Sequence, residues 1–221
     1  MKAIIAILAL AFCVPFDSGV AALAQDKQDD GWVNLFDGKT LDGWEQKNGT
    51  ATYRVEDGCV VGKTTEGSPN SFLATKKSYG DFELKFEVKV DDALNSGVQI
   101  RSASKPDFDN GRVHGPQVEI AINGTAGFIY GEGLKTGWLS EDRSDPKAQA
   151  AFKKGEWNKY RVLAEGKSIK SWVNDVPVAD LVDEKTGMMS GFIGLQVHGI
   201  KKGTGPYEVR WKNISIRELK K

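Results

Sequence analysis

The amino-acid sequence predicts an all-β protein that folds as a two-sheet antiparallel β-sandwich or jelly roll. Short runs of alternating apolar and polar residues recur along the chain, and alternation places successive side chains on opposite faces of a strand. The run at residues 82–90 is the clearest, with Phe82, Leu84 and Phe86 on one face and charged residues on the other. Turn-forming pairs separate the runs, and helix signals are sparse. Strands with one apolar face each must bury that face against a second sheet.

The alternation predicts the strands, and pairs containing Gly, Asn or Asp predict the turns between them. The predicted strands are residues 52–55, 58–62, 71–75, 81–90, 95–101, 117–122, 126–130, 157–165, 168–174, 190–197 and 207–218. The turn pairs are Asp57–Gly58, Tyr79–Gly80, Asn123–Gly124, Glu165–Gly166 and Asn174–Asp175. Residues 31–44 carry two Asp-Gly turns and apolar anchors, so we expect them to cross the end of the sandwich. A helix of one or two turns is predicted near residues 145–152, where Pro146 suits the first helical position.

Three segments divide the chain. Residues 1–24 have the pattern of a secretory signal peptide, in which Lys2 precedes an apolar run and small residues form a cleavage site. Residues 25–30 are expected to be a flexible leader, and residues 31–221 a single β-sandwich domain. The apolar run is shorter than the roughly 20 residues of a membrane-spanning helix, and no later stretch is longer. We therefore expect an exported protein without a membrane span, in the periplasm or outside the cell.

The cysteine content excludes an internal disulfide, and the charge pattern argues against two classes of partner. Cys59 is the one cysteine after the predicted signal peptide, so no internal disulfide can form, and its apolar neighbours indicate a buried strand residue. The 30 basic and 30 acidic residues balance each other. No basic stretch is interleaved with aromatic residues, as a nucleic-acid groove requires. Neither a nucleic acid nor an anionic membrane surface is therefore an expected partner.

Two central stretches, residues 94–101 and 114–122, organise the predicted site. Both alternate, and if they lie near each other their polar side chains form one patch on an apolar-backed sheet. The patch consists of Gln99, Arg101, Gln117 and Glu119. One interpretation is a floor for a polyhydroxylated ligand. The other is an ordinary solvated sheet face, with Arg101 and Glu119 as a cross-strand ion pair.

Two long polar segments, residues 102–115 and 131–154, interrupt the strand pattern. Long loops inside a compact domain are uncommon and often carry function. Trp138 in the second segment could stack on a sugar ring, because an aromatic face suits the C–H face of a pyranose. It could equally pin the segment to the edge of the sandwich, and the pattern leaves both interpretations open.

The two histidines are candidate acid–base groups. His198 follows a strand-like run whose alternation places it on the same face as Gln196, whereas His114 lies in a loop before the second central stretch. Histidine acts as a base, an acid or a metal ligand near neutral pH. The alternative for each is a structural hydrogen-bond partner, and the pattern favours function for His198 more than for His114.

The sequence lacks several catalytic signatures. It has no Gly-x-Ser-x-Gly elbow, phosphate-binding loop, dinucleotide fingerprint or paired-cysteine metal site. Retaining β-glucanases with a sandwich fold carry Glu-x-Asp-x-x-Glu on one strand, which suits two-carboxylate glycoside hydrolysis. Counted from Glu119, the corresponding positions hold Ala121 and Gly124. A glycoside-cleaving activity would therefore not use that mechanism.

A series of ordered blocks covers essentially the whole chain after the signal peptide. The blocks are NLFDGKTLDGW (34–44), YGDFEL (79–84), NSGVQIR (95–101), GPQVEI (115–120), GEWN (155–158), WVN (172–174), GFIGLQVHG (191–199) and WKNISI (211–216). In this order they resemble the 3-keto-disaccharide hydrolase domain family. The resemblance implies a concanavalin A-like lectin/glucanase fold, a keto-sugar or glycoside as ligand, and action on 3-keto-glycosides. It also allows eliminative cleavage helped by a divalent cation, but residues 121–123 lack the acidic residues of the commoner form.

A ketone at C3 would let one base start the reaction, because it acidifies the hydrogen on C2. The aglycone then leaves C1 through an enolate, and water adds to the unsaturated sugar. As a hypothesis, His198 or Glu119 is the base, and Arg101, or a cation held by Glu119 and His198, stabilises the enolate. The expected substrate-binding residues are Gln99, Gln117, Trp138, Gln196 and His114. A non-catalytic carbohydrate-binding module is the alternative function, and an interaction domain that binds no sugar is a third.

Overall fold

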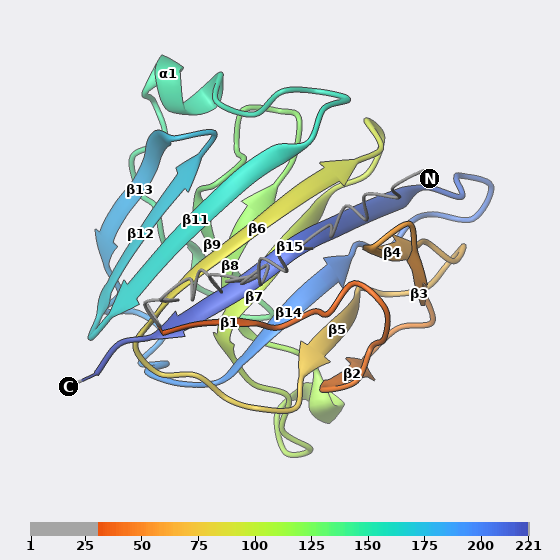
Figure 1. Ribbon diagram of the computed structural model, residues 1–221, viewed down its shortest axis with the longest axis horizontal. Coiled ribbons are helices and arrows are strands. Elements are labelled where there is room, and N and C mark those ends of the chain that lie inside the picture. The colour runs from red at the N-terminus through yellow and green to blue at the C-terminus, as the bar shows by residue number, and fades with distance from the viewer. Residues whose placement is uncertain (1–30, 221) are drawn as a thin grey trace, which may run out of the picture. The chain divides into compact units, whose positions relative to one another are not determined.

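The computed structural model of the protein describes residues 31–220, which form two antiparallel β-sheets packed face to face (Figure 1). The 8-stranded sheet has the order β13 (Val176–Val182), β12 (Ser168–Val173), β11 (Asn158–Glu165), β6 (Phe82–Val90), β15 (Glu208–Glu218), β4 (Cys59–Lys63) and β3 (Thr52–Glu56), and β1 (Trp32–Asn34) pairs with β15. The 7-stranded sheet has the order β10 (Gly137–Trp138), β9 (Ile129–Glu132), β8 (Gly115–Ile120), β7 (Ser96–Ser102), β14 (Phe192–Val197), β5 (Ser71–Thr75) and β2 (Trp44–Lys47). This architecture confirms the predicted two-sheet antiparallel sandwich.

Each predicted strand overlaps an observed one, whereas the sequence pattern misses β1, β2, β10 and β13. Three of these, β2, β10 and β13, are the outermost strands of their sheets. An outermost strand has a neighbour on one side only, so packing imposes less alternation on its side chains. The predicted helix forms as α1 (Pro146–Gln149), and the Asp145 side chain caps it by accepting a hydrogen bond from the Lys147 N–H. In the described part of the chain, no helix is long and apolar enough to cross a membrane. The predicted signal peptide and leader, residues 1–30, lie outside the described residues.

Two of the predicted turns form hairpins in which consecutive residues have positive φ. Asp57 and Gly58 join β3 to β4 with φ values of 51° and 71°, and Asn174 and Asp175 join β12 to β13 with 49° and 66°. Two positive φ values in a two-residue loop match the right-handed twist of the flanking strands. Asn, Asp and Gly tolerate this conformation best, which explains why these residue pairs predict the turns correctly.

The main hydrophobic core lies between the two sheets and uses the apolar face of nearly every long strand. It takes Leu84 and Phe86 from β6, Ile100 from β7 and Ile120 from β8, together with the fully buried Trp211 of β15. Because the odd-even alternation points these side chains inward, the intervening polar residues of β7 and β8 must point outward. The outward face of the 7-stranded sheet is therefore where a polar site can form.

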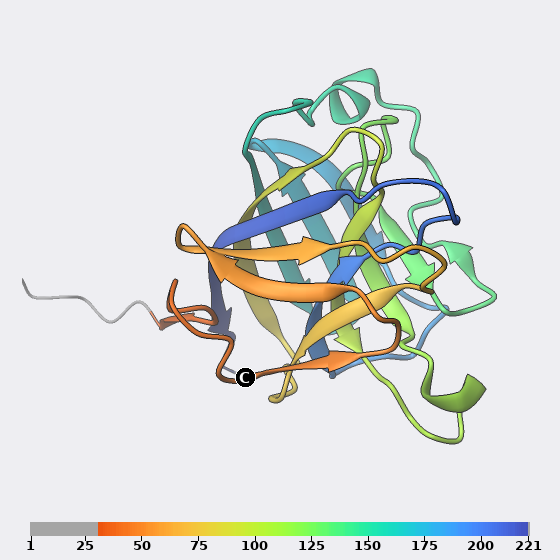
Figure 2. The same cartoon turned by 90° about the vertical axis from the view of Figure 1, so that its right-hand side faces the viewer.

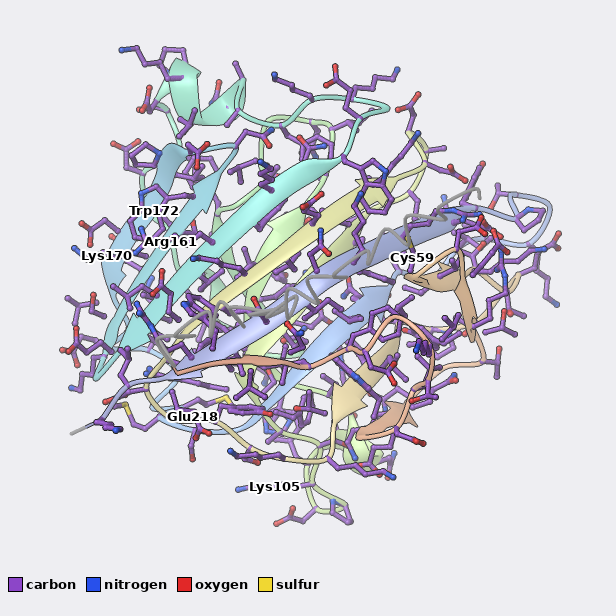
Figure 3. All side chains as sticks on the ribbon, in the orientation of Figure 1. Cys59, Lys105, Arg161, Lys170, Trp172 and Glu218 are labelled. Carbon is purple, nitrogen blue, oxygen red and sulfur yellow. The ribbon has the colours of Figure 1, made fainter. Side chains whose placement is uncertain are left out.

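The outward face of the 8-stranded sheet carries cations stacked on tryptophan rings. Arg161 lies 4.3 Å from the ring centroid of Trp172 (Figure 3), and Lys85 and Arg217 lie 4.1 and 5.1 Å from that of Trp32. Cation–π contacts at exposed positions contribute roughly 0.5–1 kcal/mol each. Each of these cations thus has an aromatic partner within the protein. We interpret this face as a solvent-facing surface whose cation–π contacts add to stability.

Cys59 is buried in β4, in agreement with the prediction of an apolar strand residue. Burial raises the pKa of its thiol, which keeps the reactive thiolate scarce. A structural role follows for this side chain.

Candidate functional site

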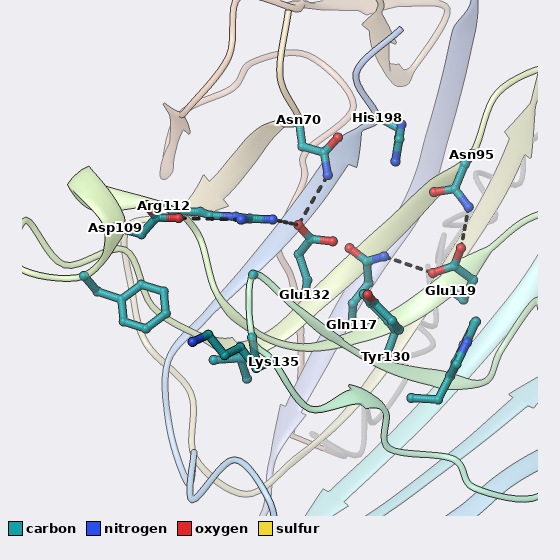
Figure 4. A pocket seen from close by; sticks show the side chains of 14 residues that line it. Asn70, Asn95, Asp109, Arg112, Gln117, Glu119, Tyr130, Glu132, Lys135 and His198 are labelled. Carbon is teal, nitrogen blue, oxygen red and sulfur yellow. Dashed lines mark hydrogen bonds and ion pairs between the residues drawn. The ribbon is translucent and has the colours of Figure 1, made fainter.

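A cavity of about 860 Å³ opens on the outward face of the 7-stranded sheet. Strand β8 supplies part of its floor, and β9, β10 and five connecting segments supply its walls. Its lining residues are Asn70, Asn95, Phe108, Asp109, Arg112, Gln117, Glu119, Tyr130, Glu132, Gly133, Leu134, Lys135, Trp138 and His198. Figure 4 shows their polar side chains converging from segments far apart in the sequence. The volume lies within the roughly 300–1,000 Å³ that is usual for small-molecule sites.

A chain of hydrogen bonds fixes the carboxylate of Glu119 in this cavity. Ser102 Oγ donates to Gln99 Oε1 over 2.8 Å, and Gln99 Nε2 donates to Gln117 Oε1 over 2.8 Å. Gln117 Nε2 in turn donates to Glu119 Oε2 over 3.0 Å, and Asn95 Nδ2 donates to the other carboxylate oxygen (Figure 4). Each amide is oriented by its neighbour, so the carboxylate is held in one position before any ligand arrives.

The pKa of Glu119 is raised above that of an ordinary glutamate. Desolvation by burial is the largest cause, because it disfavours the charged carboxylate, and the charge of Glu132 adds to it. The hydrogen bonds from Asn95 and Gln117 and the neighbouring His198 act in the opposite direction. A carboxylate whose pKa is raised is a stronger base than an ordinary glutamate, which suits it to proton transfer.

His198 presents one defined nitrogen to the cavity. Its Nδ1 lies 2.8 Å from the carbonyl oxygen of Gly199, and because a carbonyl can only accept, Nδ1 carries the hydrogen. The nitrogen left to gain or lose a proton is therefore Nε2. Asn70 Oδ1 accepts the Gly199 N–H over 2.9 Å and so holds the turn that carries the ring. In Figure 4 the His198 ring points into the cavity between Asn70 and Asn95.

The cavity contains a second carboxylate, Glu132, to which the sequence pattern assigned no role. It is buried at the end of β9 and accepts hydrogen bonds from Asn70 Nδ2 over 3.3 Å and from Gln196 Nε2 over 3.5 Å. The guanidinium of Arg112 lies 3.8 Å away (Figure 4). Both Glu132 and Arg112 lie in the two long polar segments, so segment length was the only sequence signal for them.

Aromatic side chains line one wall. Trp138 lies on β10 and meets Tyr130 of β9 edge to face, with ring centroids 5.2 Å apart. The guanidinium of Arg143 lies 4.6 Å from the Trp138 ring centroid. Trp138 thus packs at the sheet edge, as one interpretation of the sequence expects, and it also lines the cavity. Its stacking on a sugar ring stays a prediction.

Arg101 does not reach the cavity, which corrects the prediction of a patch shared with Glu119. Its φ of 49° falls in a β-bulge where the pairing of β7 with β14 shifts register. The bulge breaks the alternation that placed Gln99 and Arg101 on one face. The buried guanidinium instead donates to the carbonyls of Gly80 and Gly166 and pairs with Asp81 at 2.9 Å. Among the described residues Arg101 pairs with Asp81 and Glu119 binds Asn95 and Gln117, so the cross-strand ion pair of the alternative interpretation does not form either. A structural role replaces the catalytic one.

Three predicted substrate-binding residues lie beneath or behind the cavity lining. Gln99 and Gln196 are fully buried and hold Gln117 and Glu132, respectively. His114 is buried, and its ring packs 3.7 Å from that of Phe108, which does line the cavity. These side chains therefore position the lining residues. Of the other predicted site residues, Glu119, His198, Gln117 and Trp138 line the cavity together.

The side chains of the cavity do not fit a dedicated cation site. Among residues 31–220, no three His, Cys, Asp or Glu side chains are grouped so that they could hold a metal ion. A divalent cation needs several oxygen or nitrogen donors with free lone pairs. We therefore assign no chemical step to a cation.

The chain is similar to several known proteins. The family model described as "3-keto-alpha-glucoside-1,2-lyase-like domain" matches residues 31–217. A Bacteroides thetaiotaomicron protein named 3-keto-disaccharide hydrolase is 25% identical, across 86% of this chain and 79% of its own length.

Solved structures show the same fold. A Parabacteroides distasonis structure described as a proposed glycosyl hydrolase matches with a TM-score of 0.64 and 21% identity, covering 90% of this chain and 98% of that one. The carbohydrate-binding module CBM66 from Bacillus subtilis matches with a TM-score of 0.56 and 18% identity, covering 80% of this chain and 96% of that one. Both likenesses confirm the predicted β-sandwich class.

Proposed function

The chain belongs to the family of 3-keto-alpha-glucoside-1,2-lyase-like domains, and from this premise we propose that it cleaves glycosides whose sugar ring carries a ketone at C3. The observation that supports the proposal is the meeting of Glu119 and His198 in one polar cavity. Glu119 is held as a base with a raised pKa, and His198 offers Nε2 as the site of proton transfer. One base and one acid are what an elimination next to a ketone requires.

In the proposed reaction, Glu119 removes the proton from C2 of the keto-sugar. The electron pair of the broken C–H bond forms the C2–C3 double bond, and the ketone oxygen takes up the negative charge as an enolate. When the ketone re-forms, the pair moves to a C1–C2 double bond and the bond from C1 to the aglycone oxygen breaks. A His198 ring that carries hydrogens on both nitrogens gives its Nε2 proton to that oxygen, so the products are the free aglycone and a 1,2-unsaturated 3-keto-sugar. Water then adds to the double bond: its hydroxyl goes to C1 and its proton to His198 Nε2, while Glu119 returns its proton to C2, so both side chains regain their starting states.

The enolate needs donors in place of Arg101. Asn70, Asn95 and Gln117 present amide groups to the cavity, and Arg112 and Lys135 bring cationic side chains to its wall. Preorganised donors aimed at developing charge commonly contribute the largest part of a rate enhancement. The exposed part of the Trp138 ring would stack on the sugar and hold C2 toward Glu119.

Incubation of the purified protein with 4-nitrophenyl 3-keto-α-glucoside tests the activity. We expect release of 4-nitrophenol, and we expect the same rate after treatment with EDTA, because the described residues contain no dedicated cation site. The unoxidised 4-nitrophenyl α-glucoside is the control and should be inert, since its C2 hydrogen is not acidic. A rate that disappears with EDTA and returns with a metal ion would contradict the assignment of the mechanism to side chains alone.

Replacement of the C2 hydrogen by deuterium distinguishes elimination from direct hydrolysis. We expect a primary kinetic isotope effect on aglycone release, measured under single-turnover conditions, because the C2–H bond breaks before or while the aglycone leaves. Direct displacement at C1 leaves that bond intact and shows no primary effect. An isotope effect of unity, together with normal turnover, would contradict the elimination and favour a two-carboxylate mechanism that involves Glu132.

A non-catalytic carbohydrate-binding module remains the second candidate function, because the CBM66 structure shares the fold. Such a module would bind the intact 3-keto-glucoside and release no aglycone. Calorimetry and the nitrophenol assay on the same sample separate the two functions. We further propose that the protein acts in the periplasm or outside the cell, on the basis of the signal-like sequence of residues 1–24.

A further inference from the structure

The hydroxyl group of Tyr130 is an unused hydrogen-bond donor at the cavity. Tyr130 follows the buried core residue Ile129 on β9, so alternation turns its half-buried side chain outward, where it lines the cavity. Figure 4 shows this side chain pointing into the cavity near Gln117. Among residues 31–220 its hydroxyl makes no hydrogen bond. The phenol hydrogen is therefore available to a ligand.

Neighbours on two sides hold the Tyr130 ring in place. Strand β9 lies between β8 and β10 at the edge of the 7-stranded sheet (Figure 2). Tyr130 is paired with Gln117 of β8 on one side and with Trp138 of β10 on the other. The Trp138 ring meets it edge to face, and Gln117 is itself fixed by the hydrogen bond from Gln99. Because the phenol oxygen lies on the ring axis, fixing the ring fixes the position of this donor before a ligand binds.

Tyr130 is also a neighbour of Glu119, the proposed base. Gln117 lies opposite Tyr130, and Glu119 lies two positions further along β8, so Tyr130 and Glu119 are diagonal neighbours on one face. Diagonal neighbours in an antiparallel pair lie roughly 7–8 Å apart, which is within reach of an aromatic side chain. In a 3-keto-sugar the ketone oxygen is bonded to the carbon next to C2. A donor to that oxygen must therefore lie beside the base, as Tyr130 does.

The amide groups at the cavity already serve its two carboxylates. Asn95 and Gln117 each donate a hydrogen to Glu119, and Asn70 donates one to Glu132. Each amide thus keeps one further hydrogen, and its direction is set by the carboxylate that the first one binds. An amide is also a weaker acid than a phenol and forms a weaker hydrogen bond to an anionic oxygen.

The two cations at the cavity wall are more exposed than Tyr130. Arg112 lies 3.5 Å from Asp109 and 3.8 Å from Glu132, so carboxylates already share its charge. Lys135 is exposed in the turn between β9 and β10. An exposed ammonium group is strongly hydrated and has a flexible stem, so its position must be fixed anew for each reaction. Tyr130 combines a free donor with a fixed position.

The geometry points to Tyr130 as a catalytic residue that donates a hydrogen bond to the ketone oxygen as this becomes an enolate. When Glu119 takes the C2 proton, the C–H electron pair forms the C2–C3 double bond and the C=O π pair moves to the oxygen. The phenol proton stays on the tyrosine oxygen throughout. Its hydrogen bond is stronger to the charged enolate than to the neutral ketone, which lowers the barrier to enolisation. This inference rests on the proposed function.

A substrate analogue that enolises without being cleaved isolates this step. In 3-keto-1,5-anhydroglucitol a hydrogen replaces the aglycone at C1, so C2 can exchange its hydrogen with solvent while no aglycone leaves. Proton NMR in D2O measures this exchange. We expect Tyr130→Phe to slow the enzyme-catalysed exchange by roughly a hundredfold, the usual loss for one donor to an oxyanion. The dissociation constant of the analogue, measured by calorimetry, should rise by only about threefold, because a hydrogen bond to a neutral ketone contributes little.

Tyr207→Phe is the matched control. Tyr207 is also partly buried, its hydroxyl makes no hydrogen bond within residues 31–220, and it does not line the cavity. This variant should exchange C2 at the wild-type rate. Lys135→Met removes the competing cation and should slow the exchange less than Tyr130→Phe does. Phenylalanine keeps the ring that packs against Trp138, so Tyr130→Phe should fold, as thermal melts would verify.

The outcomes separate this inference from the proposed function. Wild-type exchange that Tyr130→Phe leaves unchanged overturns the inference alone, and so does an equal loss in Tyr207→Phe or a larger loss in Lys135→Met. Release of 4-nitrophenol by a wild-type protein that binds the analogue without exchanging C2 also overturns it, because no enolate then forms. If the wild type neither releases 4-nitrophenol nor exchanges C2, the proposed function fails and the role of Tyr130 fails with it.

Discussion

Replacement of Glu119 by Gln is expected to lower kcat for a 3-keto-glucoside by roughly a thousandfold, the middle of the range for loss of a general base. The substitution keeps the shape of the side chain but removes the lone pair that takes the C2 proton. The loss should lie in kcat with little change in KM, because the interaction is used in the transition state. Steady-state kinetics on 4-nitrophenyl 3-keto-α-glucoside measure both constants.

His198→Ala is the companion variant and should lose roughly a hundredfold, provided that protonation of the leaving oxygen limits the rate. The nitrophenolate leaving group needs less help than an alkoxide, so the loss should be larger for methyl 3-keto-α-glucoside. If both Glu119→Gln and His198→Ala cleave these substrates at the wild-type rate, the assigned site is wrong.

The stability of Glu119→Gln distinguishes a catalytic loss from unfolding. The folded state raises the pKa of Glu119, so it favours the protonated form. The stability contribution of this group is therefore fully present below its unfolded-state pKa and is lost as the pH rises through the folded-state value. Glutamine does not ionise, so the Tm of the variant relative to wild type should increase with pH, as thermal melts at acidic and neutral pH would show. A variant that melts well below wild type at every pH would attribute the lost activity to misfolding.

Arg101→Gln is expected to lower the free energy of unfolding by about 3–5 kcal/mol, the usual cost of removing one partner of a buried ion pair. The Arg101 side chain is only 1% exposed and binds Asp81 and two backbone carbonyls. Glutamine is too short and has too few donors to replace these contacts, so Asp81 would keep a charge without its cation. Urea denaturation measures the change as a shift of the midpoint.

Arg112→Gln is the matched control for this loss. It removes the same cation from an exposed site whose ion pairs are 3.5 and 3.8 Å long, so its stability should change by at most about 0.5 kcal/mol. If Arg101→Gln instead remains as stable as wild type and loses turnover, Arg101 acts on the substrate, and the structural role assigned here is wrong.

The strands could be predicted from the sequence because burial of one face of a sheet makes apolar residues recur at every second position. Residues 82–90 form the long central strand β6, and the hairpin turns fall at pairs whose residues tolerate positive φ. The outermost strands β2, β10 and β13 escaped detection, because fewer neighbours constrain their side chains. The family blocks add order along the chain, and the match to residues 31–217 bears them out.

Part of the site was predicted and part was not. Gln117 and Glu119 share a face because they lie two positions apart on one regular strand, and the structure places both in the cavity. Arg101 failed the same rule because a bulge at its position, with φ of 49°, interrupts the period. Alternation predicts orientation only where the strand is regular, and the sequence carries no clear mark of the bulge.

The sequence by itself determined the sandwich class, the positions of most strands and the polar face of β8, since these depend on local alternation and turn chemistry. Only the tertiary structure decided which distant side chains meet. Glu132, Arg112 and Asn70 come from three separate segments, and their encounter depends on loop paths that no local period encodes. The wall of the cavity therefore depends on where these three segments lie in space, which their order along the chain does not reveal.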